Sequence, residues 1–248
     1  MINMREYGQR FGLSILLALI LWLSPSSRAA ESSHVGDTHY TPVGFFDIHV
    51  CNWPDRVPFF LLLFSTRMYA QVARIDVTGP DGRALHTFDL DRYKVIQKKG
   101  KPEKRVFINQ LALPPGPTDG WYRARIAMTD GTVHTAEDYV IVRQMPRAQV
   151  VAPLDDADGI RLPVTLIWRA VPGARYYRVF VRDLWNDGKM VYESDVLSKP
   201  ELRVPDGKLV SGGVYSWRVH ARDVNEHVLL GDFNHGSQNE AVRFTVAE

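Results

Sequence analysis

The chain has 248 residues, of which 45% are hydrophobic, and a formal net charge of +2. That length suits two domains of about 100 residues each. The single cysteine, Cys51, excludes an internal disulfide, and its apolar surroundings predict a buried, unreactive core thiol. Removal of residues 1–29 would take away three arginines and one glutamate and leave a formally neutral chain, so we expect no nucleic-acid partner.

Residues 1–29 have the pattern of a secretory signal peptide. Arg5 and Arg10 precede an apolar run from Phe11 to Leu23, and small residues follow before Glu31. The apolar run is shorter than the roughly 20 residues of a membrane-spanning helix, although a short uncleaved anchor is the alternative. We therefore expect an exported protein, periplasmic or secreted, without a stable membrane span. The polar residues 30–44 would form a flexible N-terminal segment.

From residue 45 onward, the chain reads as short extended runs divided by turn residues, with no long amphipathic helix. "FFLLLFS" (residues 59–65) is typical of a strand buried between two sheets, and Thr129-Asp130-Gly131 predicts a hairpin turn. Prolines and acidic residues mark residues 146–159 as a linker. The pattern predicts an all-β fold of two tandem antiparallel β-sandwiches over residues 45–145 and 160–248.

The second block resembles a fibronectin type III domain over roughly residues 150–248. The resemblance lies in "VTLIWRAVPGARYYRVFV" and "LVSGGVYSWRVHARD". It implies that Trp168 packs in the core and that Tyr215 begins the sixth strand after the turn that contains Leu209 and Gly212. The last hairpin, "VNEHVLLGDFNHGSQNE", is longer than a simple turn requires.

The first block resembles a more distant immunoglobulin-like sandwich. "DGWYRA" is similar to the tyrosine corner at the start of the sixth strand, which would place Tyr122 in that corner. Ala124 stands where an immunoglobulin domain would carry a disulfide cysteine.

Side-chain alternation along "GGVYSWRVHARD" separates an apolar face from a polar one. Tyr215 and Trp217 belong to the core face, and the arginines and the histidine point the other way. The resemblance implies that the third, sixth and seventh strands share a sheet, so their outward residues would lie side by side. We call these residues the arginine–aromatic face: Tyr176, Arg178, Phe180, Arg182, Arg218, His220, Arg222 and Arg243.

The arginine–aromatic face is a candidate contact surface, since arginine and aromatic residues are enriched at protein interfaces. Two alternatives remain open. The arginines could pair with Asp183, Glu193 or Asp195 on a solvated face, or the face could be buried against the first domain.

No pattern of a catalytic serine, a zinc protease or a phosphate-binding glycine loop is present. We therefore predict no enzyme activity, no cofactor, and no catalytic, cofactor-binding or metal-ligating residues. Residues 155–159 ("DDADG") lack the remaining ligands of a calcium loop. The basic run 92–105 suits a solvated loop or a protected sheet edge, with binding of anionic polymers as the alternative. The last hairpin offers acid–base or metal-binding groups without a recognised spacing: Glu226, His227, Asp232, Asn234 and His235.

These observations favour a non-catalytic adaptor that binds another envelope or extracellular protein through the arginine–aromatic face. The first alternative is a carbohydrate-binding module in which Tyr176 and Phe180 stack on sugar rings. The second is a hydrolase with its site in the last hairpin.

Overall fold

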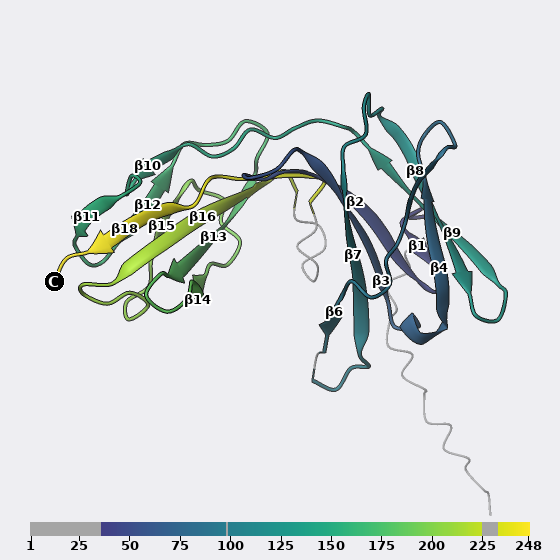
Figure 1. Ribbon diagram of the computed structural model, residues 1–248, viewed down its shortest axis with the longest axis horizontal. Coiled ribbons are helices and arrows are strands. Elements are labelled where there is room, and N and C mark those ends of the chain that lie inside the picture. Colours follow the sequence, from purple (N-terminus) through teal and green to yellow (C-terminus); the bar gives the residue numbers. More distant parts are fainter. Residues whose placement is uncertain (1–35, 98, 225–232) are drawn as a thin grey trace, which may run out of the picture. The chain divides into compact units, whose positions relative to one another are not determined.

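The computed structural model describes residues 36–97, 99–224 and 233–248 (Figure 1). The predicted signal peptide (residues 1–29) lies outside the described residues, as do Glu226, His227 and Asp232 of the last hairpin. Residues 36–248 form one compact unit. In the described part of the chain, no helix is long and apolar enough to cross a membrane.

The first sandwich consists of two antiparallel sheets. The first has the order β2 (Gly44–Asn52), β3 (Phe59–Thr66), β7 (Lys104–Ala112) and β6 (Tyr93–Ile96). The second has the order β5 (Ala84–Thr87), β4 (Val72–Thr78), β8 (Gly120–Met128) and β9 (Val133–Val140), with a short 3₁₀ turn, η1 (Tyr69–Gln71), before β4. This is the strand arrangement of an immunoglobulin-like sandwich with one added edge strand. The all-β prediction is therefore confirmed.

The core of the first sandwich follows from side-chain alternation. Phe46, Ile48 and Phe60 are fully or almost fully buried between the two sheets. The predicted tyrosine corner is present, because the Tyr122 hydroxyl donates to the carbonyl oxygen of Thr118 at 3.0 Å. Ala124 is buried in the same core, where it packs without a disulfide.

Residues 37–44 are held in place, although we expected them to be flexible. β1 (Tyr40–Thr41) forms a tight hairpin with β2. The amide of Phe46 donates to the His39 carbonyl at 2.9 Å, and the amide of Glu137 donates to the Thr38 carbonyl at 2.8 Å. These main-chain hydrogen bonds attach the segment to both β2 and β9, which polar composition alone does not reveal.

The basic run contributes an edge strand, because β6 ends the strand order of its sheet. Arg105 in the neighbouring β7 lies over the rings of Tyr69 and Tyr93, with its guanidinium carbon 4.1 and 4.2 Å from their centroids. The edge position of β6 agrees with the expectation that the basic run forms a solvated loop or a protected sheet edge.

The second sandwich also has two sheets. One has the order β10 (Val150–Ala152), β12 (Thr165–Trp168) and β15 (Glu201–Arg203). The other contains β14 (Lys189–Glu193), β13 (Tyr176–Asp183), β16 (Val214–Arg222), β17 (His235–Gln238), β18 (Val242–Val246) and β11 (Ala157–Ile160). β13 and β18 both pair with β16, as the resemblance implied. β10 and most of β11 fall within residues 146–159, so strands of this sandwich begin inside the segment predicted as a linker.

Trp168 and Trp217 are buried in the core of the second sandwich, as the sequence predicts. The Tyr215 hydroxyl also contacts the loop before its strand, but as an acceptor, because the amide of Val210 donates to it at 3.0 Å. One tyrosine near the start of β8 and another in β16 thus anchor the preceding loops.

The two sandwiches are connected by strand pairing as well as by the chain. β17 pairs in parallel with β2, with His235 opposite Val50, Gly236 opposite Cys51 and Ser237 opposite Asn52. Two side chains reinforce this junction: Asn52 donates to the Met145 carbonyl at 2.9 Å, and Ser237 donates to the Pro146 carbonyl at 2.7 Å.

Gly236 tests the junction, because a Cβ at this position would lie 2.5 Å from Phe233 Cε2 and 2.7 Å from His220 Nε2. We expect Gly236→Ala to lower the free energy of unfolding by about 1–3 kcal/mol, the usual cost of overpacking. The measurement is urea denaturation followed by tryptophan fluorescence. Gly79→Ala is the control, since the nearest atom to its Cβ is at an ordinary 3.4 Å. Equal stability of the two variants would contradict the close packing at Gly236.

Candidate functional site

The strand register brings the outward residues of three strands into rows. Arg182 in β13 and Arg243 in β18 both lie opposite Ser216 in β16, on either side of it. Two residues along β16, Arg218 lies opposite Phe180. Three arginines therefore surround Ser216 on one face of the sheet, because residues opposite one another or two apart share a face.

A hollow of about 420 Å³ opens on this face. We call it the arginine hollow, and the following residues line it: Phe180, Arg182, Met190, Ser216, Trp217, Arg218, Gln238 and Ala241. Phe180, Arg182 and Arg218, which were predicted for the arginine–aromatic face, thus border one concave site. Arg243 lies next to this site, because it is paired with the lining residue Ser216. The hollow combines cationic side chains with the apolar surfaces of Phe180 and Met190.

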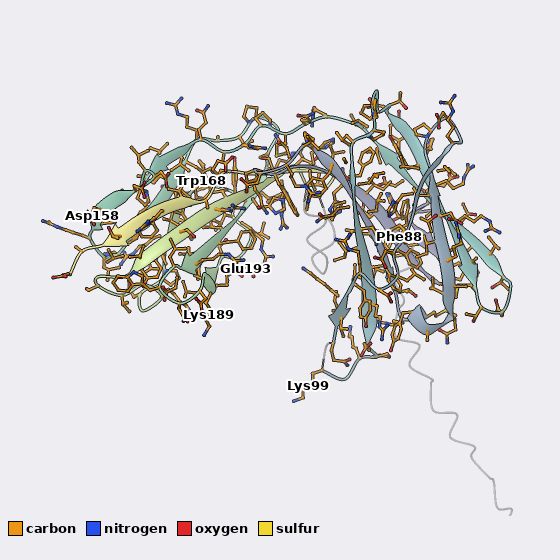
Figure 2. All side chains as sticks on the ribbon, in the orientation of Figure 1. Phe88, Lys99, Asp158, Trp168, Lys189 and Glu193 are labelled. Carbon is orange, nitrogen blue, oxygen red and sulfur yellow. The ribbon has the colours of Figure 1, made fainter. Side chains whose placement is uncertain are left out.

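The arginines differ in how far acidic partners neutralise them. Arg178 forms a 2.9 Å ion pair with Glu193, the β14 residue labelled in Figure 2, which is one of the pairings considered from the sequence. Arg182 donates to the main-chain carbonyl of Gly188 at 2.8 Å, a neutral acceptor, and no carboxylate of the described residues forms an ion pair with it. Arg218 faces Asp55 at 3.5 Å across solvent-exposed surroundings, where ion pairs are weak.

The Arg243 side chain is exposed, its guanidinium Nε lies 4.0 Å from Asp156 Oδ1, and its main-chain amide donates to Asp155 Oδ1 at 2.8 Å. At this separation and exposure the pair contributes little. Positive charge therefore concentrates at Arg182, Arg218 and Arg243. Of the arginines of this face, Arg178 has the shortest ion pair, at 2.9 Å from Glu193.

His220 and Arg222 do not belong to the accessible surface, which corrects their place in the arginine–aromatic face. Their exposed fractions are 4% and 5%. Phe233 covers them, with its ring centroid 4.7 Å from that of His220 and 5.3 Å from the Arg222 guanidinium carbon. Tyr176, opposite Arg222, is half-buried. At this end, the face is covered mainly by the last hairpin of its own sandwich, and the first sandwich contributes Trp53, whose ring centroid lies 6.4 Å from that of His220.

Burial also governs the charges at this covered end. Desolvation, helped by the adjacent Arg222, lowers the pKa of His220 well below its usual value, which keeps the imidazole neutral. Desolvation lowers the pKa of Arg222 to about 10, and the nearby Arg178 adds to the shift. Arg222 remains charged at neutral pH.

Cys51 is fully buried beside Phe59 and Phe233, which confirms the prediction of a core thiol. Desolvation raises its thiol pKa well above the usual value, and the positive charges of Arg56 and Arg222 only partly oppose this effect. The reactive thiolate is therefore strongly disfavoured.

Among the described hairpin residues, His235 has a structural position. Its Nδ1 lies 2.6 Å from Asp223 Oδ2 and its Nε2 lies 2.6 Å from the Ile141 carbonyl oxygen. Both ring nitrogens thus already have partners within the chain, and the side chain is buried, which gives the imidazole a structural role at this position. Asp223 also accepts hydrogen bonds from the amides of Asn234 and His235, so the pair closes the base of the hairpin.

Several residues of the arginine hollow could not be assigned from the sequence. Met190 enters from β14, opposite Arg182 in the short hairpin after β13, whereas Gln238 enters from β17 after the long last hairpin. Asp55 reaches Arg218 from the turn after β2. Phe233 covers the neighbouring face from the last hairpin, and the residues around it have no periodic pattern that indicates burial.

No model of a known protein family matches the sequence, and no curated protein matches it. The solved structures found in the comparison include the tandem Ig repeats of Dlar, with 14% identity, a TM-score of 0.32, and coverage of 82% of this chain and 98% of that one. The FN1–FN3 domains of chicken CNTN1 have 14% identity, a TM-score of 0.28, and coverage of 84% and 66%.

Another is Tp47, the 47-kilodalton lipoprotein of Treponema pallidum. It has 13% identity, a TM-score of 0.37, and coverage of 83% of this chain and 50% of that one. Because all three TM-scores are low, the assignment as tandem β-sandwiches depends on the strand order of the chain itself.

The burial of Cys51 makes its chemistry testable. We expect the native thiol to remain unreactive toward Ellman's reagent at pH 7 and at pH 9, because burial excludes the reagent and raises the thiol pKa. One equivalent should react after unfolding in guanidinium chloride. Ser198→Cys, at an exposed position, is the control and should add one rapidly reacting thiol. Rapid reaction of the native wild-type chain would contradict the burial of Cys51.

Proposed function

We propose that the protein is an exported, non-catalytic interaction module that acts as an adaptor in the cell envelope or outside the cell. It binds another protein at the arginine hollow. The observation that carries this proposal is the grouping of Arg182, Arg218 and Arg243 around Ser216, beside Phe180 and a concave surface.

The physical chemistry of the hollow suits recognition. Guanidinium groups form bidentate hydrogen bonds with carboxylates, and their weak hydration lowers the cost of burying them in a complex. Phe180 and Met190 add apolar area that a partner would cover. Arg182 supplies a charge that no ion pair within the hollow compensates, because its contact there is a main-chain carbonyl.

A double charge reversal, Arg182→Glu with Arg218→Glu, tests this function. We expect the envelope or extracellular protein that the wild-type chain captures to bind at least about tenfold more weakly, because both introduced carboxylates would repel the acidic groups of the partner. The melting temperature should change little, since both side chains lie at the surface. Capture identifies the partner by mass spectrometry, and calorimetry with the purified partner gives the dissociation constants.

The matched control reverses two arginines outside the hollow, Arg83→Glu with Arg203→Glu, both on exposed surface. This control should keep wild-type affinity even though its change in net charge is the same. Equal weakening by both double variants would indicate nonspecific electrostatics, and unchanged binding by the first would remove the hollow from consideration.

A carbohydrate-binding module is the second candidate, and it is favoured by the position of Phe180 in the wall of the hollow. An aromatic ring there can stack on the apolar face of a sugar. In that case purified glycans should bind without any protein partner, and Phe180→Ala should abolish binding. Tyr139→Phe, which alters an exposed aromatic residue of the first sandwich, is the control. Absence of glycan binding in calorimetry would reject this candidate.

A further inference from the structure

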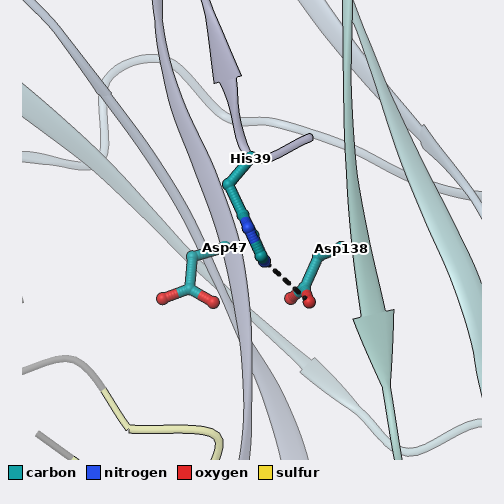
Figure 3. A group of neighbouring side chains, drawn as sticks. All are labelled: His39, Asp47 and Asp138. Carbon is teal, nitrogen blue, oxygen red and sulfur yellow. Dashed lines mark hydrogen bonds and ion pairs between the residues drawn. The ribbon is translucent and has the colours of Figure 1, made fainter. Parts of the chain in front are cut away.

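Three side chains with metal-binding atoms meet in the first sandwich, far along the chain from the arginine hollow. Figure 3 shows His39, which precedes β1, between Asp47 of β2 and Asp138 of β9. One ligand atom from each residue lies within 4.8 Å of the other two, and His39 Nε2 is 3.1 Å from Asp138 Oδ1. Asp47 and Asp138 are only 4% and 6% exposed.

Each of the three groups is oriented by a further contact. His39 Nδ1 lies 2.7 Å from Asp37 Oδ1, which leaves Nε2 directed at Asp138. Asp138 Oδ2 accepts the amide hydrogen of Ile48 at 2.8 Å. Histidines that bind metals usually donate their other ring hydrogen to a carboxylate, which fixes the tautomer and the ring orientation. His39 and Asp37 have this relation.

Asp47 is positioned in a similar way. Its Oδ2 lies 2.8 Å from Nε2 of the buried His49. The carboxylate is thereby held at the side of the cluster opposite Asp138 in Figure 3. A side chain that is already ordered by such a contact can bind an ion with little further loss of conformational freedom.

The charge of the group favours a cation. Asp37, Asp47 and Asp138 contribute three carboxylates, and His39 and His49 contribute two imidazoles. These five groups sum to a negative charge even when both imidazoles are protonated. Two of the carboxylates are buried, where negative charge is costly. A divalent ion would reduce this cost.

We propose that His39 Nε2, Asp47 and Asp138 bind a divalent transition-metal ion, with Zn²⁺ as the test ion. One imidazole nitrogen and two carboxylate oxygens suit Zn²⁺, whereas Ca²⁺ and Mg²⁺ prefer oxygen ligands alone. Ligand atoms about 3 Å apart can both lie at about 2.0–2.2 Å from one Zn²⁺ ion. The ion would take the place of the direct contact between His39 and Asp138 and of the hydrogen that Nε2 carries in it, and that proton would be released to solvent.

Such a site would join three separate parts of the chain: the segment before β1, the strand β2 and the strand β9. Its effect would be to fasten residues 37–41 to the sandwich, because a metal ion that binds only the folded state stabilises the folded state. The site lies on different residues from those of the arginine hollow, so the two proposals fail or succeed independently.

The experiment is a calorimetric titration of the full chain with ZnCl₂ after treatment with EDTA and removal of the chelator. We expect saturable binding of about one Zn²⁺ per chain and an increase in melting temperature. Co²⁺ in place of Zn²⁺ should give visible absorption bands typical of mixed nitrogen and oxygen ligands. Mg²⁺ should bind more weakly than Zn²⁺.

Two variants assign the site. His39→Gln and Asp138→Asn should each weaken Zn²⁺ binding by about 10–100-fold and abolish the Co²⁺ bands. In the second variant the amide oxygen of the new side chain can still accept the Ile48 hydrogen bond, so the fold should be preserved. His134→Gln, in the same strand β9 but outside the cluster, is the control and should bind like the wild-type chain.

Absence of saturable binding, or equal binding by all three variants, would overturn the proposal. The first result would identify the cluster as an internal ion-pair network, and the second would identify adventitious surface binding. Circular dichroism verifies that each variant is folded, and His39→Gln alters a segment at the margin of the sandwich, where loss of folding is not expected.

Discussion

The central strand of the second sandwich, β16, determines which surfaces the protein exposes. On one edge of β16, β13 pairs along nearly the whole length of the strand. On the other edge of β16, β18 pairs with the first half and β17 with the second half. Where β18 is the neighbour, the outward face stays open and forms the arginine hollow. Where β17 is the neighbour, Phe233 covers the face and buries His220 and Arg222. Because side chains alternate along β16, one face of the strand packs in the core. Its other face lines the arginine hollow at one end and is covered near the junction with the first sandwich at the other.

Local sequence was sufficient for properties that depend on periodicity. The alternation in residues 214–222 correctly separates Trp217 from Arg218, and the continuous apolar run of residues 59–65 correctly predicts the buried strand β3. The hairpin at Asp130-Gly131 and the corner formed by Tyr122 were also predictable, because turns and corners have local chemical requirements. These features together define the sandwich architecture.

Contacts between distant segments could not be predicted in this way. Nothing in the sequence of residues 233–238 indicates that they pair with β2. The sequence therefore left open whether His220 lies on the surface or is buried within the protein. His39 occupies a polar stretch whose composition suggests mobility, yet Asp138, about a hundred positions later, holds its ring. Pairings of this kind depend on the three-dimensional path of the chain, which one sequence does not encode in any short pattern.

A nearly balanced total charge conceals two regions of opposite character. The second sandwich gathers guanidinium groups around Ser216, while the first gathers carboxylates around His39. In the arginine hollow the cations are partly hydrated and available to external anions. Around His39 two of the carboxylates, those of Asp47 and Asp138, are buried, and burial makes their charge costly unless nearby groups or a small ion compensate it. Composition averages over both regions and therefore excludes neither kind of binding.

The pairing of β17 with β2 has a consequence for the order of folding. It joins strands near opposite ends of the described chain, so a large entropy of loop closure must be overcome before it forms. A polypeptide that emerges with its N-terminus first presents an open β2 edge, with Cys51 and Phe59 uncovered, until Phe233 and β17 arrive. This nascent first sandwich is a species that can aggregate or recruit a chaperone, and synthesis of the last few strands ends that vulnerability.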